Sequence, residues 1–279
     1  MADSAIVEAM SERETIEIST KGPVTKEWLL RDLKLLGVEE GMNIMFHVSL
    51  SKLGWVLGGS ETVIHAVLAA VGEGGTIAMP TFTSGNTDPS NWQAPPVPKE
   101  WWPVIREQMP AFDSKTSPAR AMGQVGEFFR TMPNVIRSNH PTASWAALGP
   151  KAQTVTKHEE ISCGYGRKSP CQHFYDLKGH VLSLGTDKTT ILHYAEVLAD
   201  FAGKSFVDEG TAAVVDGKRQ WVKYKTLDWC DDDFALIRAD YIKDGKPHTR
   251  GAVAYGEATL FPICELVDYA VAWMERNRS

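Results

Sequence analysis

A histidine and a glutamate lie three residues apart at positions 193 and 196, a spacing suited to proton transfer. Side chains three apart on a helix are neighbours, so the carboxylate of Glu196 could orient the His193 imidazole and raise its basicity. The positive N-terminal end of the helix would favour the neutral ring, the form that a general base needs. From this segment alone, however, an ordinary solvated helix face is the favoured interpretation, because exposed polar faces far outnumber active sites.

A predicted strand and turn position this pair. The apolar residues 181–184 predict a strand that turns through Gly185 into the helix, and Asp187 or Thr189 would supply the N-cap. The apolar stripe of the helix consists of Ile191, Leu192, Ala195, Leu198 and Ala199. His193 and Glu196 fall on the opposite side of that stripe.

A second candidate site is predicted where the first core strand, residues 42–48, ends before a helix at residues 60–71. His47, Ser49 and Ser51 lie at this strand end. Backbone N–H groups and hydroxyls in such a place suit a phosphate or an anionic cofactor tail. The stretch matches neither G-x-x-x-x-G-K-[ST] nor G-x-G-x-x-G, so a tight connection that needs glycine is the alternative.

Other residue types in the chain could bind a metal or attack a substrate. Imidazoles and carboxylates bind zinc, but no H-E-x-x-H or similar spacing is present, and no metal is expected. The residues considered as ligands are His47, His140, His193, Asp113 and the acidic residues around Asp231. The serines considered as nucleophiles are Ser49, Ser51, Ser138 and Ser144, and none lies in a G-x-S-x-G elbow. Cys163 and Cys171 are interpreted as small, partly buried thiols.

The acidic cluster Asp231 to Asp233 has two interpretations. Three carboxylates directly before Phe234 would stabilise the N-terminus of a helix predicted over residues 231–242, which is a sufficient structural reason for them. One of them could instead face a cleft and bind an ammonium group of a substrate. The pattern alone leaves both interpretations open.

The composition is that of an ordinary globular protein. The chain has 279 residues, of which 43% are hydrophobic and 23% charged, and a formal net charge of −6. This charge argues against a nucleic-acid partner and is compatible with a cationic small molecule. Four cysteines without a C-x-x-C pair or a signal peptide fit a reduced, cytoplasmic protein. The absence of an apolar run of roughly 18 residues argues against a membrane span.

Alternating elements predict an α/β fold that becomes mixed α+β in the C-terminal third. We expect a three-layer-like mixed sheet flanked by helices in a single large domain over residues 21–279, preceded by a loosely held arm over residues 1–20. Residues 81–98 predict a long loop, and 205–215 with 220–225 predict a hairpin turning at Asp216-Gly217. Other predicted helices cover residues 25–36, 101–108, 123–131, 169–177 and 260–275; other predicted strands cover 75–79, 146–149 and 252–255.

Five ordered motifs resemble those of the aminoglycoside 3-N-acetyltransferases, which are unrelated to the GNAT acetyltransferases. The motifs are His47-x-Ser-Leu-Ser51, Gly75-Thr-x-x-x-Pro80, Phe112-Asp-x-x-x-Ser-Pro118, Arg137-Ser-x-His-Pro141 with Ala147-x-Gly-Pro150, and Leu184-Gly followed by Thr189-Thr-x-Leu-His-x-Ala-Glu196. The resemblance runs from about Leu29 to Ile242. Each motif is weak alone, and the ordered set is specific.

The resemblance implies an acetyl-CoA-dependent N-acetylation of the 3-amino group of an aminoglycoside antibiotic, which would confer resistance. It implies that His193 is the general base and Glu196 its acidic support. It assigns acetyl-CoA to Val48, Ser49, Leu50, Ser51, Arg137 and Ser138, although Val48 stands where a serine is frequent. It assigns the ammonium groups of the antibiotic to Asp113, Asp231 and Asp232.

Three alternatives stay open beside this interpretation. The same fold could acylate a different, biosynthetic amine. A serine hydrolase acting through Ser49 or Ser51 and a non-catalytic CoA-binding module are more remote. The expected assembly is a monomer or a homodimer.

Overall fold

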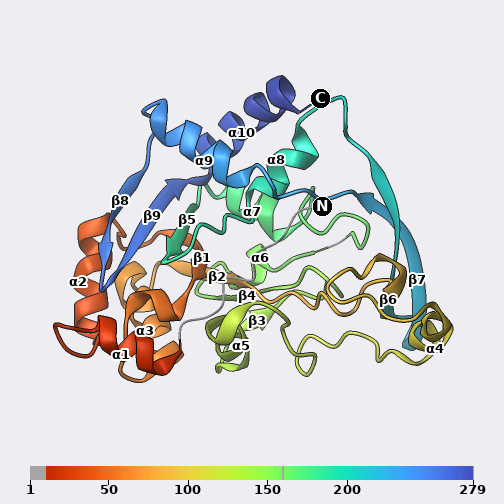
Figure 1. The fold of residues 1–279 in the computed structure, drawn as a ribbon, viewed down its shortest axis with the longest axis horizontal. Coiled ribbons are helices and arrows are strands. Elements are labelled where there is room, and N and C mark those ends of the chain that lie inside the picture. Colours follow the sequence, from red (N-terminus) through yellow and green to blue (C-terminus); the bar gives the residue numbers. More distant parts are fainter. Residues whose placement is uncertain (1–10, 159, 279) are drawn as a thin grey trace.

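A mixed seven-stranded sheet forms the centre of the molecule, with the strand order β3-β4-β2-β1-β5-β9-β8 (Figure 1). The computed structural model describes residues 11–158 and 160–278. Its strands are β1 (Asn43–Val48), β2 (Thr76–Pro80), β3 (Ile136–Arg137), β4 (Trp145–Leu148), β5 (His180–Leu184), β6 (Phe206–Val215), β7 (Lys218–Leu227), β8 (Thr249–Val253) and β9 (Gly256–Pro262). Its α-helices are α1 (Glu12–Ile18), α2 (Lys26–Leu36), α3 (Gly59–Val71), α4 (Trp102–Gln108), α5 (Gly123–Thr131), α6 (Ala152–Val155), α7 (Pro170–Asp176), α8 (Leu192–Leu198), α9 (Phe234–Lys243) and α10 (Ile263–Asn277).

The three central strands are parallel, so their carboxyl ends meet at one edge of the sheet. β1 pairs in parallel with β2 and with β5, whereas β4, β3, β9 and β8 join by antiparallel pairing. β1 is buried on both faces: Ile44 and Phe46 enter one core cluster and Met45 the other. This two-sided burial explains the continuous apolar run in the sequence.

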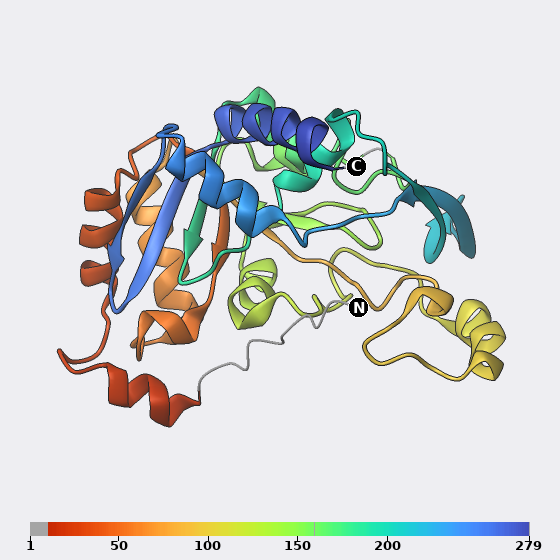
Figure 2. The same cartoon turned by 45° about the horizontal axis from the view of Figure 1, so that its top comes forward.

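Helices cover both faces of the sheet and make two separate cores (Figures 1 and 2). On one face α2, α3 and α5 pack side chains such as Leu33, Ile64 and Phe129 against the strands. On the other face, α6 to α10 contribute residues such as Phe174 and Ile237. The expected α/β class, mixed and flanked by helices, is therefore confirmed.

The β6–β7 ribbon stands outside the central sheet, at the end of the molecule away from α2 (Figures 1 and 2). Its two-residue turn is Asp216-Gly217, and both residues have positive φ, 50° and 74°. Such a turn matches the right-handed twist of paired strands. The predicted hairpin is confirmed. Each strand has ten residues: β6 begins one residue later than predicted, and β7 is longer than predicted by two residues at each end.

Several predicted boundaries are wrong. The final helix begins at Ile263, because residues 256–262 form β9, antiparallel to β5 and β8. Pro262 closes the strand and takes the N-cap position of α10. The helix predicted over residues 60–71, for which Ser60 was the expected cap, begins at Gly59 instead, and Gly58 takes the N-cap position with a positive φ.

The predicted N-terminal arm divides into two parts. Residues 1–10 lie outside the described residues, and residues 12–18 form α1 with a Ser11–Glu14 capping box. Ser19 accepts a hydrogen bond from the Trp55 N–H at 2.7 Å, so the segment after α1 contacts the body. Among helices within residues 11–278, none is long and apolar enough to cross a membrane.

Candidate active site

The His193–Glu196 pair is the centre of the candidate site. His193 Nδ1 and Glu196 Oε2 lie 2.5 Å apart within one turn of α8. The Glu196 side chain is only 1% exposed and that of His193 14%, so the solvated-face interpretation is wrong. Because the carboxylate occupies Nδ1, the ring nitrogen left for a substrate is Nε2.

A tight turn after β5 brings α8 to the strand ends. Gly185 has φ +62°, and a Cβ there would lie 2.7 Å from the Lys52 Cβ, so this position requires glycine. The predicted N-cap is wrong: α8 begins at Leu192, and Thr189 donates its hydroxyl to the Asp187 carbonyl instead. The loop before α8 thus forms hydrogen bonds within itself, and the helix begins about one turn later than predicted.

Three aromatic rings surround the His193 imidazole. Tyr165 stacks on it with centroids 4.6 Å apart, while Phe234 and Trp229 contact it edge-on at 4.8 and 5.5 Å. These rings limit the rotation of the imidazole and exclude water from its faces. Sequence reasoning missed all three as site residues, although Phe234 directly follows the acidic cluster that it singled out.

Glu196 has partners of its own. Its Oε1 accepts a hydrogen bond from Arg278 at 2.6 Å and another from the Cys230 N–H at 3.2 Å. Arg278 was not predicted from the sequence as a site residue, because no local pattern connects the residue after α10 to α8. A buried carboxylate with both a cation and an imidazole as neighbours is held in one orientation.

A cavity of about 420 Å³ opens at His193, where β1, β2 and β5 end. Its wall contains apolar, aromatic, basic and acidic groups in one enclosure. The residues that line it are Phe46, His47, Val48, Met79, Pro80, Phe82, Ala121, Met122, Gly123, Tyr165, Thr186, Lys188, Thr190, His193 and Asp231. We call it the acceptor cavity.

A second cavity of about 600 Å³ lies beside the first, and Val48 and Gly123 line both. Its other lining residues include Ser49, Leu50 and Ser51. We call it the donor cavity, because it holds the strand end that the sequence assigned to an anionic cofactor. The Ser49 N–H donates to the Leu184 carbonyl at 2.9 Å, so that group is not free for a ligand.

His47 lies at the floor of the acceptor cavity. Its side chain is buried, and its Nε2 has no hydrogen-bond partner among the described residues. Burial, helped by the charges of Arg238 and Lys188, lowers the pKa of His47 to about 3. His47 is therefore neutral at physiological pH.

The lowered pKa of His47 predicts acid-sensitive stability. An unfolded histidine titrates near pH 6.5. Below that pH the His47 side chain therefore binds a proton in the unfolded chain but not in the folded protein. The contribution of neutral His47 to the free energy of unfolding is fully present above about pH 6.5. It is lost as pH falls toward 3, by up to about 1.4 kcal/mol per pH unit. Denaturant unfolding of His47→Gln should show a shallower decline than wild type; the exposed His65→Gln should not. Equal slopes for His47→Gln and wild type would contradict this.

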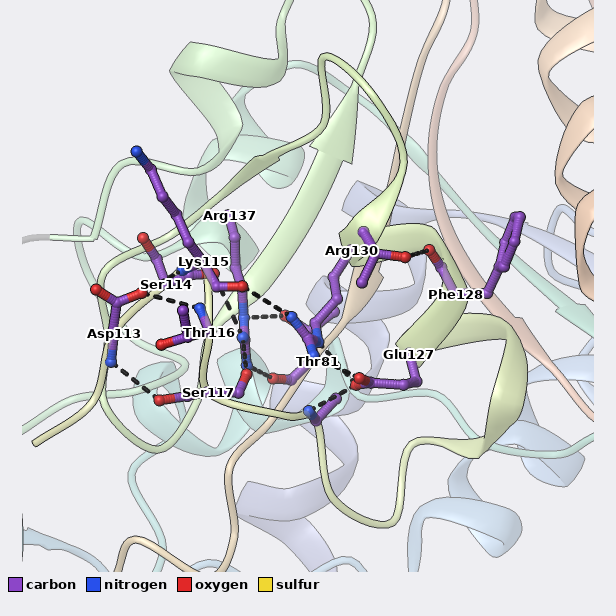
Figure 3. Close-up of polar contacts among 12 residues, drawn as sticks. Thr81, Asp113, Ser114, Lys115, Thr116, Ser117, Glu127, Phe128, Arg130 and Arg137 are labelled. Carbon is purple, nitrogen blue, oxygen red and sulfur yellow. Dashed lines mark hydrogen bonds and ion pairs between the residues drawn. The ribbon is translucent and has the colours of Figure 1, made fainter. Parts of the chain in front are cut away.

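Arg137 and Ser138 do not line either cavity. The guanidinium of Arg137 donates to Thr81 Oγ1 at 3.1 Å and to the carbonyls of Thr81 and Ser117 (Figure 3). It also donates to Ser144 Oγ at 3.1 Å. Burial lowers the pKa of Arg137 to about 10. Arg137 thus fastens the loop that follows Phe112 to the end of β2.

Ser138 is also occupied within the fold. Its hydroxyl accepts a hydrogen bond from the Trp145 N–H at 2.9 Å, and its side chain is 2% exposed. For both residues the assignment to acetyl-CoA stays a prediction. The contacts observed are those of β3 and β4 and the loops beside them.

The three carboxylates predicted to bind the ammonium groups of the substrate lie in different places. Asp231 lines the acceptor cavity, where its carboxylate lies 3.6 Å from Lys188 Nζ. Asp232 is exposed and does not line it. Asp113 accepts the N–H groups of Lys115 and Thr116 in a turn (Figure 3), and these bonds lower its pKa.

The metal and nucleophile alternatives find little support. Within residues 11–158 and 160–278 no group of three or more His, Cys, Asp or Glu side chains could hold a metal ion. The serines considered as nucleophiles do not line the acceptor cavity with His193. Burial raises the pKa of Cys171 and, with Glu160, that of Cys163, so both thiols stay protonated.

Comparison with known proteins points to one family. The family model described as aminoglycoside 3-N-acetyltransferase matches residues 45–275. YokD of Bacillus subtilis, an SPbeta prophage-derived aminoglycoside N(3')-acetyltransferase-like protein, is 38% identical over 264 residues, covering 94% of this chain and 96% of YokD. Aminoglycoside N(3)-acetyltransferase VII of Streptomyces paromomycinus is 37% identical over 272 residues, covering 92% and 93% of the two chains.

Solved structures agree with the sequence comparison. The crystal structure of YokD has a TM-score of 0.92 at 37% identity, covering 95% of this chain and 98% of YokD. AAC-IIIb, solved as a binary complex with CoASH, has a TM-score of 0.81 at 32% identity, covering 91% and 97%. AAC-VIa bound to sisomicin has a TM-score of 0.82 at 32% identity, covering 92% and 100%.

Proposed function

The chain belongs to the aminoglycoside 3-N-acetyltransferase family, and from this premise we propose that it transfers an acetyl group from acetyl-CoA to the 3-amino group of an aminoglycoside. His193 acts as the general base in a direct transfer. The observation that carries the proposal is the His193–Glu196 pair, which opens into the acceptor cavity beside the donor cavity. Acetylation of the amine removes a positive charge from the antibiotic, so the proposed consequence in the cell is resistance.

The chemistry of the acceptor explains why a base is needed. An amine is largely protonated at neutral pH and cannot attack a thioester in that form. The ammonium group first loses one proton to solvent. His193 Nε2 then accepts a second proton from the amine nitrogen as that nitrogen bonds to the acetyl carbon, and Glu196 stabilises the imidazolium that forms. When the carbon–sulfur bond breaks, His193 returns a proton to the thiolate of CoA. No acyl-enzyme is required.

The donor cavity suits the acetyl donor. Its lining includes Val48, Ser49, Leu50 and Ser51, and AAC-IIIb was solved with CoASH in a related fold. We assign the donor to this cavity, with its thioester at the junction formed by Val48 and Gly123. The hydroxyls of Ser49 and Ser51 are candidate donors to the oxyanion.

The acceptor cavity suits a cationic amine. Asp231 supplies a carboxylate beside His193, and AAC-VIa was solved with sisomicin bound. Asp113 and Asp232, which lie outside this cavity, are proposed to contact outer ammonium groups. Electrostatic attraction of this kind acts between exposed groups and is weakened by salt.

Lys188 should reduce affinity for the acceptor, because its ammonium group pairs with Asp231 at 3.6 Å. A cationic substrate must compete with this lysine for the carboxylate. We expect Lys188→Met to lower the KM of the aminoglycoside about two- to fivefold at low salt, as an exposed ion pair contributes up to about 1 kcal/mol. The matched control is Lys34→Met on α2. An unchanged or higher KM for Lys188→Met would show that Asp231 does not bind the acceptor.

A thiol-release assay tests the proposed reaction. The chain is incubated with acetyl-CoA and gentamicin-, kanamycin- or apramycin-type acceptors, and free CoA is measured against a no-acceptor control. Aminoglycoside-dependent release supports the proposal. Release only with other amines would favour the biosynthetic-amine alternative, and binding without release would favour a CoA-binding module. Acyl-enzyme trapped at Ser49 or Ser51 would favour a hydrolase.

A further inference from the structure

Arg278 makes several hydrogen bonds beside the His193–Glu196 pair. It directly follows α10 and donates from Nη1 to Glu196 Oε1 at 2.6 Å. Its Nε and Nη2 donate to the two carboxylate oxygens of Asp233 at 2.7 and 2.6 Å, and Nη2 also reaches the Cys230 carbonyl at 3.0 Å. One guanidinium therefore joins α8 to the segment that begins at Cys230.

The surroundings make this bridge a built feature of the fold. The Arg278 side chain is 12% exposed and lies over the Phe201 ring, 5.1 Å from its centroid. Burial alone would lower the pKa of Arg278. The hydrogen bonds with Asp233 and Glu196 together outweigh this effect, so the pKa of Arg278 is raised. The helix before it is anchored, since Trp273 Nε1 donates to Asp240 on α9 at 2.8 Å.

The bridge connects to the neighbours of two residues that line the acceptor cavity, His193 and Asp231. On one side it fixes Glu196, which in turn holds His193 Nδ1. On the other side it fixes Asp233, two residues after the cavity-lining Asp231. The family model ends at residue 275, so Arg278 lies outside the region that the family description covers.

We propose that Arg278 is a positioning residue of the transfer site, holding Glu196 against His193 and the 230–233 segment against α8. This inference rests on the proposed role of His193 as the base. Arg278 lines neither the acceptor cavity nor the donor cavity. Its positive charge also repels a proton added to the Glu196–His193 pair.

Removal of the charge should move the pH profile as well as lower activity. In Arg278→Gln the pair keeps its proton to higher pH, whichever of its two members carries it. We expect the acidic limb of kcat/KM to rise by about one pH unit or more, and kcat at its optimum to fall by up to about 100-fold. The KM for acetyl-CoA should stay near the wild-type value, because the donor cavity lies elsewhere.

Two further variants separate positioning from simple stability. Arg278→Lys keeps the charge but cannot form the forked bridge, so its acidic limb should stay near wild type while kcat falls severalfold. The control is Arg276→Ala, at an exposed arginine in the last turn of α10, and it should match wild type in both. An unshifted acidic limb in Arg278→Gln would overturn the proposal. Were Arg278→Gln unable to fold, a wild-type kcat in Arg278→Lys would overturn it equally.

An NMR titration of the His193 ring separates this inference from the proposed reaction. Its midpoint should move to higher pH in Arg278→Gln and stay in place in Arg276→Ala. A wild-type chain that acetylates no amine would refute the proposed function. A shifted midpoint in Arg278→Gln would still show that Arg278 acts on the His193–Glu196 pair. An unshifted midpoint in an active enzyme would refute only the role of Arg278.

Discussion

Replacement of His193 by alanine should lower kcat by about 10²- to 10⁴-fold, the usual contribution of a general base. The Kd of acetyl-CoA should change little, because His193 does not line the donor cavity. The ring contributes mainly in the transition state, so kcat falls with little change in substrate binding. Steady-state kinetics measure kcat, and calorimetric titration with acetyl-CoA measures its Kd.

The matched control for this variant is His65→Ala. His65 lies on α3 with its side chain 45% exposed, and its Nε2 lies 3.8 Å from Glu61. We expect its kcat to equal that of wild type. A His193→Ala enzyme with near-normal kcat would remove His193 from the mechanism.

Substitution of Glu196 by alanine should reduce both activity and stability. It removes the acceptor of the His193 Nδ1 proton and leaves the Arg278 guanidinium with one carboxylate fewer. Breaking a buried pair by removing one partner costs about 3–5 kcal/mol in the free energy of unfolding. kcat should fall by about 10²-fold or more, because the imidazole loses its orientation and tautomer.

A double variant divides these two effects. Glu196→Leu combined with Arg278→Met removes both charges of this pair. Asp233 then loses its guanidinium partner but is partly exposed, so we expect part of the stability lost in Glu196→Leu to return. The kcat should remain low, because no carboxylate faces His193. Recovery of kcat together with stability would mean that Glu196 only supports the fold. Denaturant unfolding and steady-state assays on the same preparations give both answers.

The sheet and its helices were largely predictable, because their signals are local. Residues 44–46 form a short apolar run, since both faces of β1 are buried, and such a run predicts a central parallel strand. The side chain of Thr25 caps α2, and Gly37 ends it in a left-handed conformation, as the sequence indicates. Asp216-Gly217 likewise determines the β6–β7 hairpin.

The errors in the fold arise where tertiary pairing overrides local pattern. Residues 256–262 contain Gly256 and Glu257, which are poor strand formers, but pairing with β5 and β8 makes them β9. Thr189 and Ser60 are good capping residues, yet the loops before α8 and α3 place other residues at the N-caps. Propensity alone could not reveal these choices.

The candidate site was predictable only in its centre. His193 and Glu196 are close in sequence, so helical spacing identifies them as a pair. Tyr165 and Arg278 reach the pair from loops and helix ends distant in sequence, and no periodicity connects them. Arg137 was assigned to acetyl-CoA because of its motif, but its hydrogen bonds within the fold use most of its N–H donors.

The measurement that tests the central claim most directly is the structure of the reaction product. Wild-type chain is incubated with acetyl-CoA and a gentamicin-type acceptor, and the acetylated nitrogen is identified by NMR and mass spectrometry, in parallel with His193→Ala. We predict one acetyl group on the 3-amino nitrogen for each thiol released, and almost no product from His193→Ala. Thiol release without N-acetylated antibiotic, or equal product from both enzymes, would contradict the account.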